Sequence, residues 1–254
     1  MDTELFVGDI VEFSPDGISV LCPRTNLCTR PYVANLDALI IVLSVLPSPD
    51  YVLVDKLLIL CAQQKITPIL CVNKKDISTN AFLKKVERDY KHFNIFIVSA
   101  KSGKNLKKLK KAIKNKFVGF CGQSAVGKTS ILNALNKGFN LEIGDLSRKT
   151  ERGKHTTRTT EIFKLFKNTY ICDTPGFTKI SLSDIDPEVL KDFYPEFSEV
   201  ENGCKFSMCL HINEPNCKVQ KLVESGKLSE DRYYRYLDIH DEVTREWKNR
   251  YGKR

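Results

Sequence analysis

The sequence lacks a hydrophobic run long enough to cross a membrane. A spanning helix needs about 20 consecutive apolar residues, whereas the longest run, at residues 38–46, has the length of a strand. The first residues, MDTELFVGD, contain no basic segment followed by an apolar stretch, as a secretory signal would. These absences predict a cytoplasmic protein that neither spans a membrane nor is secreted.

A disulfide framework is also missing. The chain has nine cysteines, an odd number that argues against paired cysteines in a chain without a secretory signal. Four of them lie in or beside apolar runs, where a free cysteine behaves as a small hydrophobic residue: Cys61, Cys71, Cys121 and Cys172. Internal repeats and low-complexity tracts are absent as well. With 42% hydrophobic and 28% charged residues, the composition is that of an ordinary globular protein.

Through the middle of the chain, short apolar segments alternate with amphipathic ones. This alternation predicts an α/β fold with a mostly parallel sheet. Strands are expected at residues 39–45, 68–72, 95–98, 117–121, 160–166 and 169–172. Helices are expected at residues 52–64, 80–93 and 105–116, and from residue 131.

Two segments depart from this alternation. Residues 1–34 predict a small β module with a hairpin at the Ser-Pro-Asp-Gly turn of residues 14–17. From about residue 184 the β character is lost, and a polar helix is expected from Ser229, its N-cap, to about residue 250. We therefore expect three domains: a β module at 1–34, an α/β domain at 35–185 and a mostly helical domain at 186–254.

A phosphate-binding loop is indicated at residues 122–129. GQSAVGKT fits the pattern G-x-x-x-x-G-K-[ST] and lies between a strand and an apolar helix, and these two flanks disfavour an incidental glycine-rich turn. The backbone N–H groups and the helix N-terminus would surround the phosphates. Lys128 would contact the β- and γ-phosphates, and the Thr129 hydroxyl would bind Mg²⁺. The predicted nucleotide contacts are Gly122, Gln123, Ser124, Ala125, Val126, Gly127, Lys128, Thr129 and Ser130.

Two further motifs, NKKD at residues 73–76 and SAK at residues 99–101, each follow a strand directly. A carboxylate at Asp76 could accept hydrogen bonds from N1–H and the amino group of guanine, which adenine cannot offer, and such a site discriminates strongly. NKKD alone is four common polar residues in a loop, but SAK makes it specific, because the Ala100 N–H would approach the guanine O6. The pair predicts GTP and GDP as ligands. The residues involved are Asn73, Lys74, Lys75, Asp76, Ser99, Ala100 and Lys101.

The magnesium site needs ligands from two more segments. In DTPG at residues 173–176, Asp173 would hold Mg²⁺ through water and the Gly176 N–H would meet the γ-phosphate. A switch threonine is expected in the polar loop at 144–158. Thr157 is the better candidate because it directly precedes Arg158 and a strand, but Thr156 stays open. The expected Mg²⁺ ligands are Thr129, Thr157 and Asp173.

Hydrolysis also requires a group that activates water. The residue after DTPG is Phe177, which can neither orient nor deprotonate water, where Ras-like proteins have a glutamine. His155 is the nearest residue able to act as a general base. The alternative is a solvated loop histidine, which leaves water activation unexplained.

The order of these motifs is permuted. The base-reading motifs precede the phosphate loop, whereas most GTPases have the reverse order. In this order, and in RPYVANLD (30–37), GQSAVGKTSILNAL (122–135) and GKHTTR (153–158), the chain resembles the circularly permuted GTPases of the RsgA (YjeQ/YloQ) family.

That resemblance implies a biological role and an N-terminal fold. Family members act in late maturation of the small (30S) ribosomal subunit, which stimulates hydrolysis, so the subunit and its 16S rRNA are expected partners. His155 matches the histidine of the family's GxHTT motif. The family begins with an OB-fold barrel, of which only about three strands fit before Ala34, so a truncated OB-like module is expected. A monomer is expected.

A metal site is indicated near the C-terminus. Cys204-x₄-Cys209-x-His211-x₅-Cys217 supplies three thiolates and one imidazole, a set that favours one structural, tetrahedral Zn²⁺. The spacing also matches the family's C-terminal domain. Three free cysteines and a chance histidine would be unusual in so polar a segment.

The net charge of +9 favours an anionic partner such as RNA. Basic residues concentrate at 101–116, 148–167 and 245–254. Aromatic residues interleave with the last patch and could either stack on RNA or pack the helix: Tyr233, Tyr234, Tyr236, Trp247 and Tyr251. Two other functions remain open: a permuted GTPase serving the large subunit or another RNA, and an RNA-binding scaffold with negligible hydrolysis.

Overall fold

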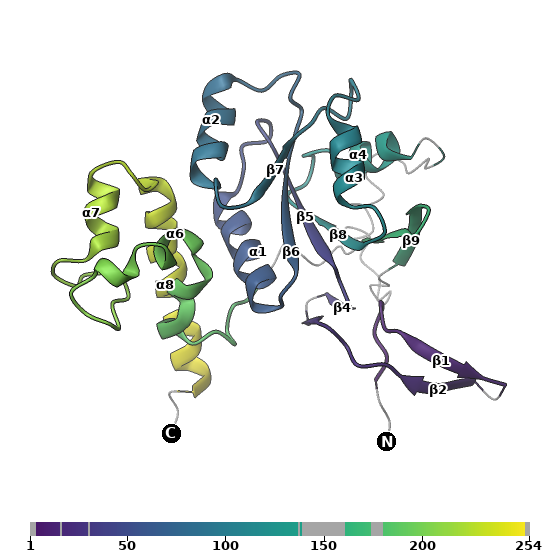
Figure 1. Ribbon diagram of the computed structural model, residues 1–254, viewed down its shortest axis with the longest axis horizontal. Coiled ribbons are helices and arrows are strands. Elements are labelled where there is room, and N and C mark those ends of the chain that lie inside the picture. Colours follow the sequence, from purple (N-terminus) through teal and green to yellow (C-terminus); the bar gives the residue numbers. More distant parts are fainter. Residues whose placement is uncertain are drawn as a thin grey trace. The chain divides into compact units, whose positions relative to one another are not determined.

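The computed structural model describes residues 4–15, 17–29, 31–136, 138, 161–173 and 180–251 (Figure 1). The chain divides into two compact units. The sheet unit comprises Met1–Pro49, Gln64–Thr79 and Asn94–Lys179, and the helical unit comprises Asp50–Gln63, Asn80–Phe93 and Ile180–Arg254. No helix among the described residues is long and apolar enough to span a membrane.

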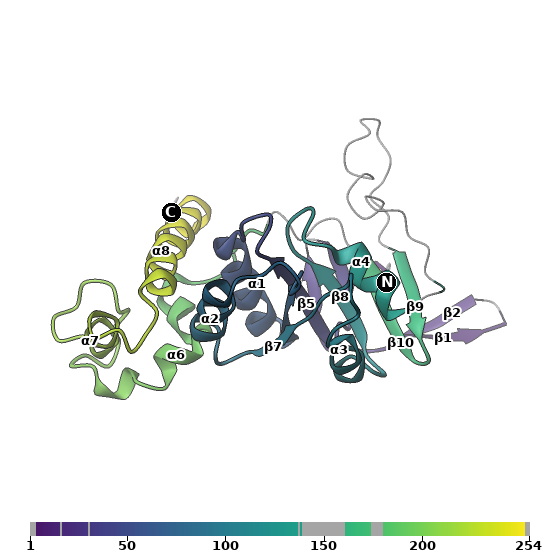
Figure 2. The ribbon, with the colours of Figure 1, turned by 90° about the horizontal axis from the view of Figure 1, so that it is seen from above.

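A six-stranded sheet forms the centre of the sheet unit. Its order is β7 (Asn94–Ile97), β6 (Thr67–Asn73), β5 (Ala38–Ser44), β8 (Phe117–Cys121), β10 (Thr169–Asp173) and β9 (Glu161–Phe166). All neighbours are parallel except β9 and β10, and Figure 2 shows β9 at the sheet edge. Every residue of β5 is buried, as a continuous apolar run in a central parallel strand requires. The predicted mostly parallel α/β sheet is confirmed.

Two helices of the sheet unit, α3 (Leu106–Ala112) and α4 (Lys128–Leu135), pack on one face of this sheet. The alternate residues Ala38, Ile40 and Val42 of β5 belong to the same core as the apolar stripes of both helices. Successive side chains of a strand point to opposite faces, so this core fixes α4, and the phosphate-loop sequence before it, against the sheet.

The N-terminal residues form two small antiparallel sheets. Strand β1 (Val11–Ser14) pairs with β2 (Gly17–Leu21), which confirms the predicted hairpin, and β3 (Leu27–Thr29) pairs with β4 (Tyr32–Ala34). The carboxylate of Asp9 binds the guanidinium of Arg24 at 2.7 Å and the backbone N–H of Phe6 at 2.8 Å. The second hairpin was not predicted, because three-residue strands leave too few positions for an alternating pattern.

The helical unit contains α1 (Tyr51–Gln63), α2 (Asn80–Asp89), the 3₁₀ helices η1 (Pro187–Phe193) and η2 (Glu201–Gly203), α6 (Pro195–Ser198), α7 (Lys218–Glu224) and α8 (Glu230–Tyr251). Ser229 caps α8 as predicted, since its hydroxyl accepts the N–H of Arg232 at 3.3 Å. Residues 180–251 contain no strand. Helices α1 and α2 cluster with the C-terminal helices although they lie between strands in sequence. The three-domain division at residues 34 and 185 stays a prediction.

Candidate functional site

The predicted nucleotide motifs lie at one edge of the sheet. Asn73 is the last residue of β6, Asp173 is the last residue of β10, and Gly122 follows β8 directly. These strands and β5 between them are parallel, so their carboxyl ends meet at the same edge, where ligands of open α/β sheets bind. The sheet order thus brings together motifs that the permuted sequence separates.

Asn73 connects the three motifs. Its side chain is buried; Nδ2 donates to the carbonyl of Val126 in the phosphate loop at 3.0 Å, and Oδ1 accepts the N–H of Ala100 at 3.1 Å. Gly127 has a φ of 94°, and a Cβ there would lie 2.4 Å from Nδ2 of Asn73. The amide of Asn73 therefore fits only beside a glycine, and it links the base-reading segments to the phosphate loop.

Asp76 and Ser99 lie next to each other, as the predicted base site requires. The buried Ser99 hydroxyl donates to the exposed Asp76 carboxylate at 2.5 Å. This hydrogen bond holds the pKa of the Asp76 carboxyl below its usual value. Asp76 is consequently an ionised acceptor near neutral pH, the form that could accept two N–H groups of a purine.

Lys74 is a connection that the sequence did not reveal. Its ammonium donates to the carbonyls of Leu46, at 2.6 Å, and Ala125, at 2.7 Å, so the NKKD segment also holds the phosphate loop through a side chain. The residue has a φ of 59°, which directs the chain away from β6.

The phosphate loop passes close to β5. Gly122 has a φ of 131°, and a Cβ there would lie 2.2 Å from the carbonyl oxygen of Val42, so only glycine fits. The ammonium of Lys128 donates to the carbonyls of Gly122, at 2.8 Å, and Gln123, at 2.7 Å, and therefore lies over the loop. Thr129 is buried in the first turn of α4.

Part of the predicted site cannot be placed. His155, Thr156, Thr157 and Gly176 lie outside the described residues. For Asp173 the backbone is placed, in register with Phe120 of β8, which puts it beside the strand that leads into the phosphate loop. The catalytic and magnesium-binding roles of these residues stay predictions.

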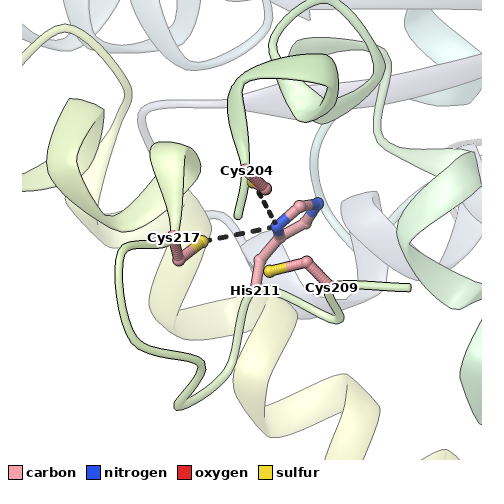
Figure 3. A group of neighbouring side chains, drawn as sticks. All are labelled: Cys204, Cys209, His211 and Cys217. Carbon is pink, nitrogen blue, oxygen red and sulfur yellow. Dashed lines mark hydrogen bonds between the residues drawn. The ribbon is translucent and has the colours of Figure 1, made fainter. Parts of the chain in front are cut away.

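The four predicted zinc ligands come together in the helical unit. The ligand atoms of Cys204, Cys209, His211 and Cys217 all lie within 4.8 Å of one another. Nδ1 of His211 lies 3.4 Å from the sulfur of Cys217 and 3.7 Å from that of Cys204 (Figure 3). A tetrahedral Zn²⁺ with ordinary bond lengths separates its ligand atoms by about 3.5–3.8 Å. The residues therefore fit a tetrahedral metal with Nδ1 as the histidine ligand.

Glu214 organises the loop that carries His211, and spacing alone did not reveal it. One carboxylate oxygen accepts the N–H of Leu210 at 2.6 Å, and the other accepts those of Ile212 at 2.8 Å and Asn213 at 3.2 Å. Partial burial opposes ionisation, but these donors outweigh it, so the pKa of Glu214 lies below its usual value. The carboxylate fixes the backbone on both sides of His211, which itself has a φ of 63°.

The carbonyl groups of the same loop are held by helices α7 and α8. The hydroxyl of Tyr236 donates to Leu210 at 2.5 Å, that of Tyr233 to His211 at 2.7 Å, and the amide of Gln220 to Ile212 at 2.5 Å. Tyr233 and Tyr236 are buried. These two aromatic residues therefore support the metal loop and are not available for stacking on RNA.

A buried ionic network holds α8 to α1. Asp55, fully buried in α1, accepts hydrogen bonds from Arg232 and, at 2.5 Å, from Arg235; Arg232 also binds Glu196. The only signal in the sequence was an aspartate inside the apolar helix YVLVDKLLILCAQ. Its partners lie 177 and 180 residues away, so no local pattern could identify them.

Comparisons with known proteins agree with the motifs. Residues 21–183 match the family model of the RsgA GTPase. The small ribosomal subunit biogenesis GTPase RsgA of Thermotoga neapolitana is 40% identical over 250 residues, which cover 94% of this chain and 84% of that protein. The protein of the same name from Caldanaerobacter subterraneus subsp. tengcongensis is 38% identical over 253 residues, 96% and 85% of the two chains.

Solved structures support the same assignment. The crystal structure of YjeQ from Thermotoga maritima aligns with a TM-score of 0.80 and 36% identity over 95% of this chain and 85% of that one. YloQ, described as a circularly permuted GTPase, aligns with a TM-score of 0.75 and 28% identity over 96% and 82%. The resemblance drawn from the motifs is confirmed: the chain belongs to the RsgA GTPase family, a family of GTP-hydrolysing enzymes.

Proposed function

We propose that this chain hydrolyses GTP to GDP and phosphate during late maturation of the small (30S) ribosomal subunit, which stimulates the reaction. The observation that carries the GTPase assignment is the position of Asn73, whose amide joins Ala100 to the phosphate loop. The ribosomal role rests on the name of the relatives, small ribosomal subunit biogenesis GTPase. The partners would be the subunit and its 16S rRNA, and the protein would act as a cytoplasmic monomer.

Guanine recognition would use the ionised Asp76. Its carboxylate would accept N1–H and the amino group of guanine, while the Ala100 N–H, held by Asn73, would donate to O6. Asp76→Asn replaces one acceptor oxygen with a donor, so GTP should bind at least about tenfold more weakly and xanthosine triphosphate more tightly. Ile77→Ala, which removes an exposed side chain from the same loop, is the control. If Asp76→Asn lost affinity for GTP and for xanthosine triphosphate equally, the result would argue against this base contact.

The phosphates would be bound by Lys128 and the loop N–H groups. Mg²⁺, held by Thr129, Thr157 and Asp173, would neutralise charge that develops on the transferred phosphoryl group. His155 would accept the proton of the attacking water. His155→Ala should lower single-turnover hydrolysis about 10²–10⁴-fold and spare GTP affinity. Unchanged hydrolysis would refute this role.

The cysteine and histidine cluster would hold one structural Zn²⁺. Four protein ligands leave no open position, so the ion would stabilise the fold and not react with substrate. The thiolate-rich donor set disfavours magnesium or calcium, which prefer oxygen ligands.

GTP turnover with and without purified ribosomal subunits is the decisive experiment. Stimulation by small subunits and not by large ones supports the proposed role. Stimulation by large subunits would favour a permuted GTPase of that particle, and co-sedimentation should then follow the same preference. Nucleotide-dependent RNA binding without any turnover would identify an RNA-binding scaffold.

A further inference from the structure

A long stretch of this chain carries positive charge only. Residues 90–141 contain eleven lysines and no aspartate or glutamate. Five of these lysines are exposed on α3 and the turns that flank it, and we call them the α3 lysine face: Lys104, Lys107, Lys108, Lys111 and Lys114. None of the five forms an ion pair with a carboxylate in the part of the chain that the structure describes.

Neighbouring lysines differ because they have contacts within the protein. The ammonium of Lys110 donates to the carbonyl of Leu135 at 3.1 Å and lies 4.5 Å from the ring centre of Phe166. Lys101 belongs to the predicted base motif. The five residues of the α3 lysine face therefore form a distinct set, whose charge no described carboxylate balances.

These charges are unfavourable for the helix itself. Lys107 and Lys111 are four residues apart and Lys108 and Lys111 three apart, so like charges face each other on successive turns. Like charges at these spacings destabilise a helix. An anion bound along this face would remove the repulsion.

The shape of the helix indicates which kind of anion. The apolar side of α3, at Leu106, Leu109 and Ile113, is buried in the core of the sheet unit. A membrane-binding helix inserts such an apolar face into lipid, and that face is not available here. Protein interfaces are depleted in lysine and centred on apolar or aromatic residues. A lysine face without an apolar centre is instead suited to a phosphodiester backbone.

We propose that the α3 lysine face binds the phosphate backbone of RNA. Successive helical turns, about 5.4 Å apart, would let lysines contact successive phosphates without reading bases, which positions the protein without sequence preference. The choice of RNA as the nucleic acid rests on the proposed ribosomal role. The RNA contact itself is assigned to α3, a helix of the sheet unit.

The test compares two variants of the full chain with equal loss of charge. The α3 variant replaces Lys107, Lys108, Lys111 and Lys114 with glutamine, which keeps helix propensity. The control variant makes the same replacement at four exposed lysines of the helical unit: Lys84, Lys91, Lys221 and Lys227. Fluorescence anisotropy measures binding of a short RNA duplex and of a single strand at a series of salt concentrations.

The salt dependence gives a quantitative expectation. Each phosphate contact contributes about 0.7–0.9 to the slope of log K against log salt concentration, so the α3 variant should lose about 3 from that slope, and the control little. A smaller slope in the α3 variant for the duplex, for the single strand or for both identifies the form of RNA that is bound. An unchanged slope, or equal loss in the control, overturns the proposal.

Two further measurements keep the result interpretable. If polyglutamate binds the wild-type chain as tightly as RNA and the α3 variant loses it equally, the face accepts acidic protein and the proposal is wrong. Thermal unfolding and GTP hydrolysis without RNA are measured on the same samples and should be unchanged in the α3 variant. A chain that never hydrolyses GTP but shows the loss of slope would refute the proposed GTPase and support the RNA contact.

Discussion

Replacing Glu214 should weaken metal binding although Glu214 is not a metal ligand. Its two carboxylate oxygens accept three backbone N–H groups on either side of His211. Glu214→Ala leaves these donors without their acceptor and frees the backbone that sets the direction of the His211 ring. Glu214→Gln keeps one oxygen, so either Leu210 or the pair of Ile212 and Asn213 faces an NH₂ group instead.

The size of the effect follows from the exposure of the site. A hydrogen bond to a charged group contributes about 1.5–3 kcal/mol, and water can reach the half-buried Glu214 and replace part of the loss. Loss of an outer partner of a ligand weakens metal sites about 10–100-fold, or about 1.4–2.8 kcal/mol. We therefore expect Glu214→Ala to bind Zn²⁺ about 10–100-fold more weakly and Glu214→Gln about tenfold more weakly.

Competition with a chromophoric chelator measures this affinity directly. Glu224→Ala removes an exposed carboxylate from α7 and serves as the control. The important readout is that Zn²⁺ affinity increases from Glu214→Ala to Glu214→Gln to the wild type, because this order follows the number of acceptor oxygens that remain at residue 214. Wild-type affinity in Glu214→Ala would refute the argument that this carboxylate organises the metal loop.

Three other predictions concern the buried network, the nucleotide site and the metal. Asp55→Ala should lower the free energy of unfolding by about 3–5 kcal/mol in urea titrations, because Arg232 and Arg235 lose a buried partner. The control Asp241→Ala breaks an exposed pair with Arg245 and should lower it by about 0.5 kcal/mol. Equal losses in the two variants would contradict the importance of the buried network. Gly127→Ala should weaken GTP binding at least about tenfold, whereas Gly226→Ala, which also has a positive φ but no neighbour within 4 Å, should leave affinity unchanged in titration calorimetry. Removal of zinc by a chelator should lower the melting temperature by about 5 °C or more, reversibly on adding Zn²⁺, and identical melting curves would contradict a structural metal.

The sheet could be predicted from the sequence because its strands are continuous apolar runs bounded by polar motifs. The strand predicted at 68–72 is β6 (Thr67–Asn73), and that at 117–121 is β8. Helix ends were less predictable. The helix expected at 105–116 ends at Ala112 with Ile113 as its C-cap, and Asn115 beyond it has a φ of 58°, although the lysines around it still fit a helical pattern. A polar pattern cannot distinguish a helix from the turn that ends it.

Residues that act by long-range contact could not be predicted. The position of the metal ligands follows from their spacing, but Glu214 looks like any loop glutamate until its backbone partners are seen. Tyr233 and Tyr236 lie among basic residues, so the sequence left open whether they stack on RNA or pack inside. Their hydroxyl groups bind the metal loop, and this choice depends on tertiary structure alone.

The pairing of Asp55 with Arg232 has a consequence for the timing of synthesis. The two residues are 177 positions apart, so at about 5–20 residues per second the ribosome needs about 9–35 s to make the second after the first. During that interval α1 has an acidic side chain in an apolar helix and no arginine to pair with it. The helical unit therefore cannot complete its buried network as its N-terminal part emerges, because α1 must wait for the arginines of α8. The emergence of α8, and not that of α1, should mark the moment when this unit becomes resistant to protease.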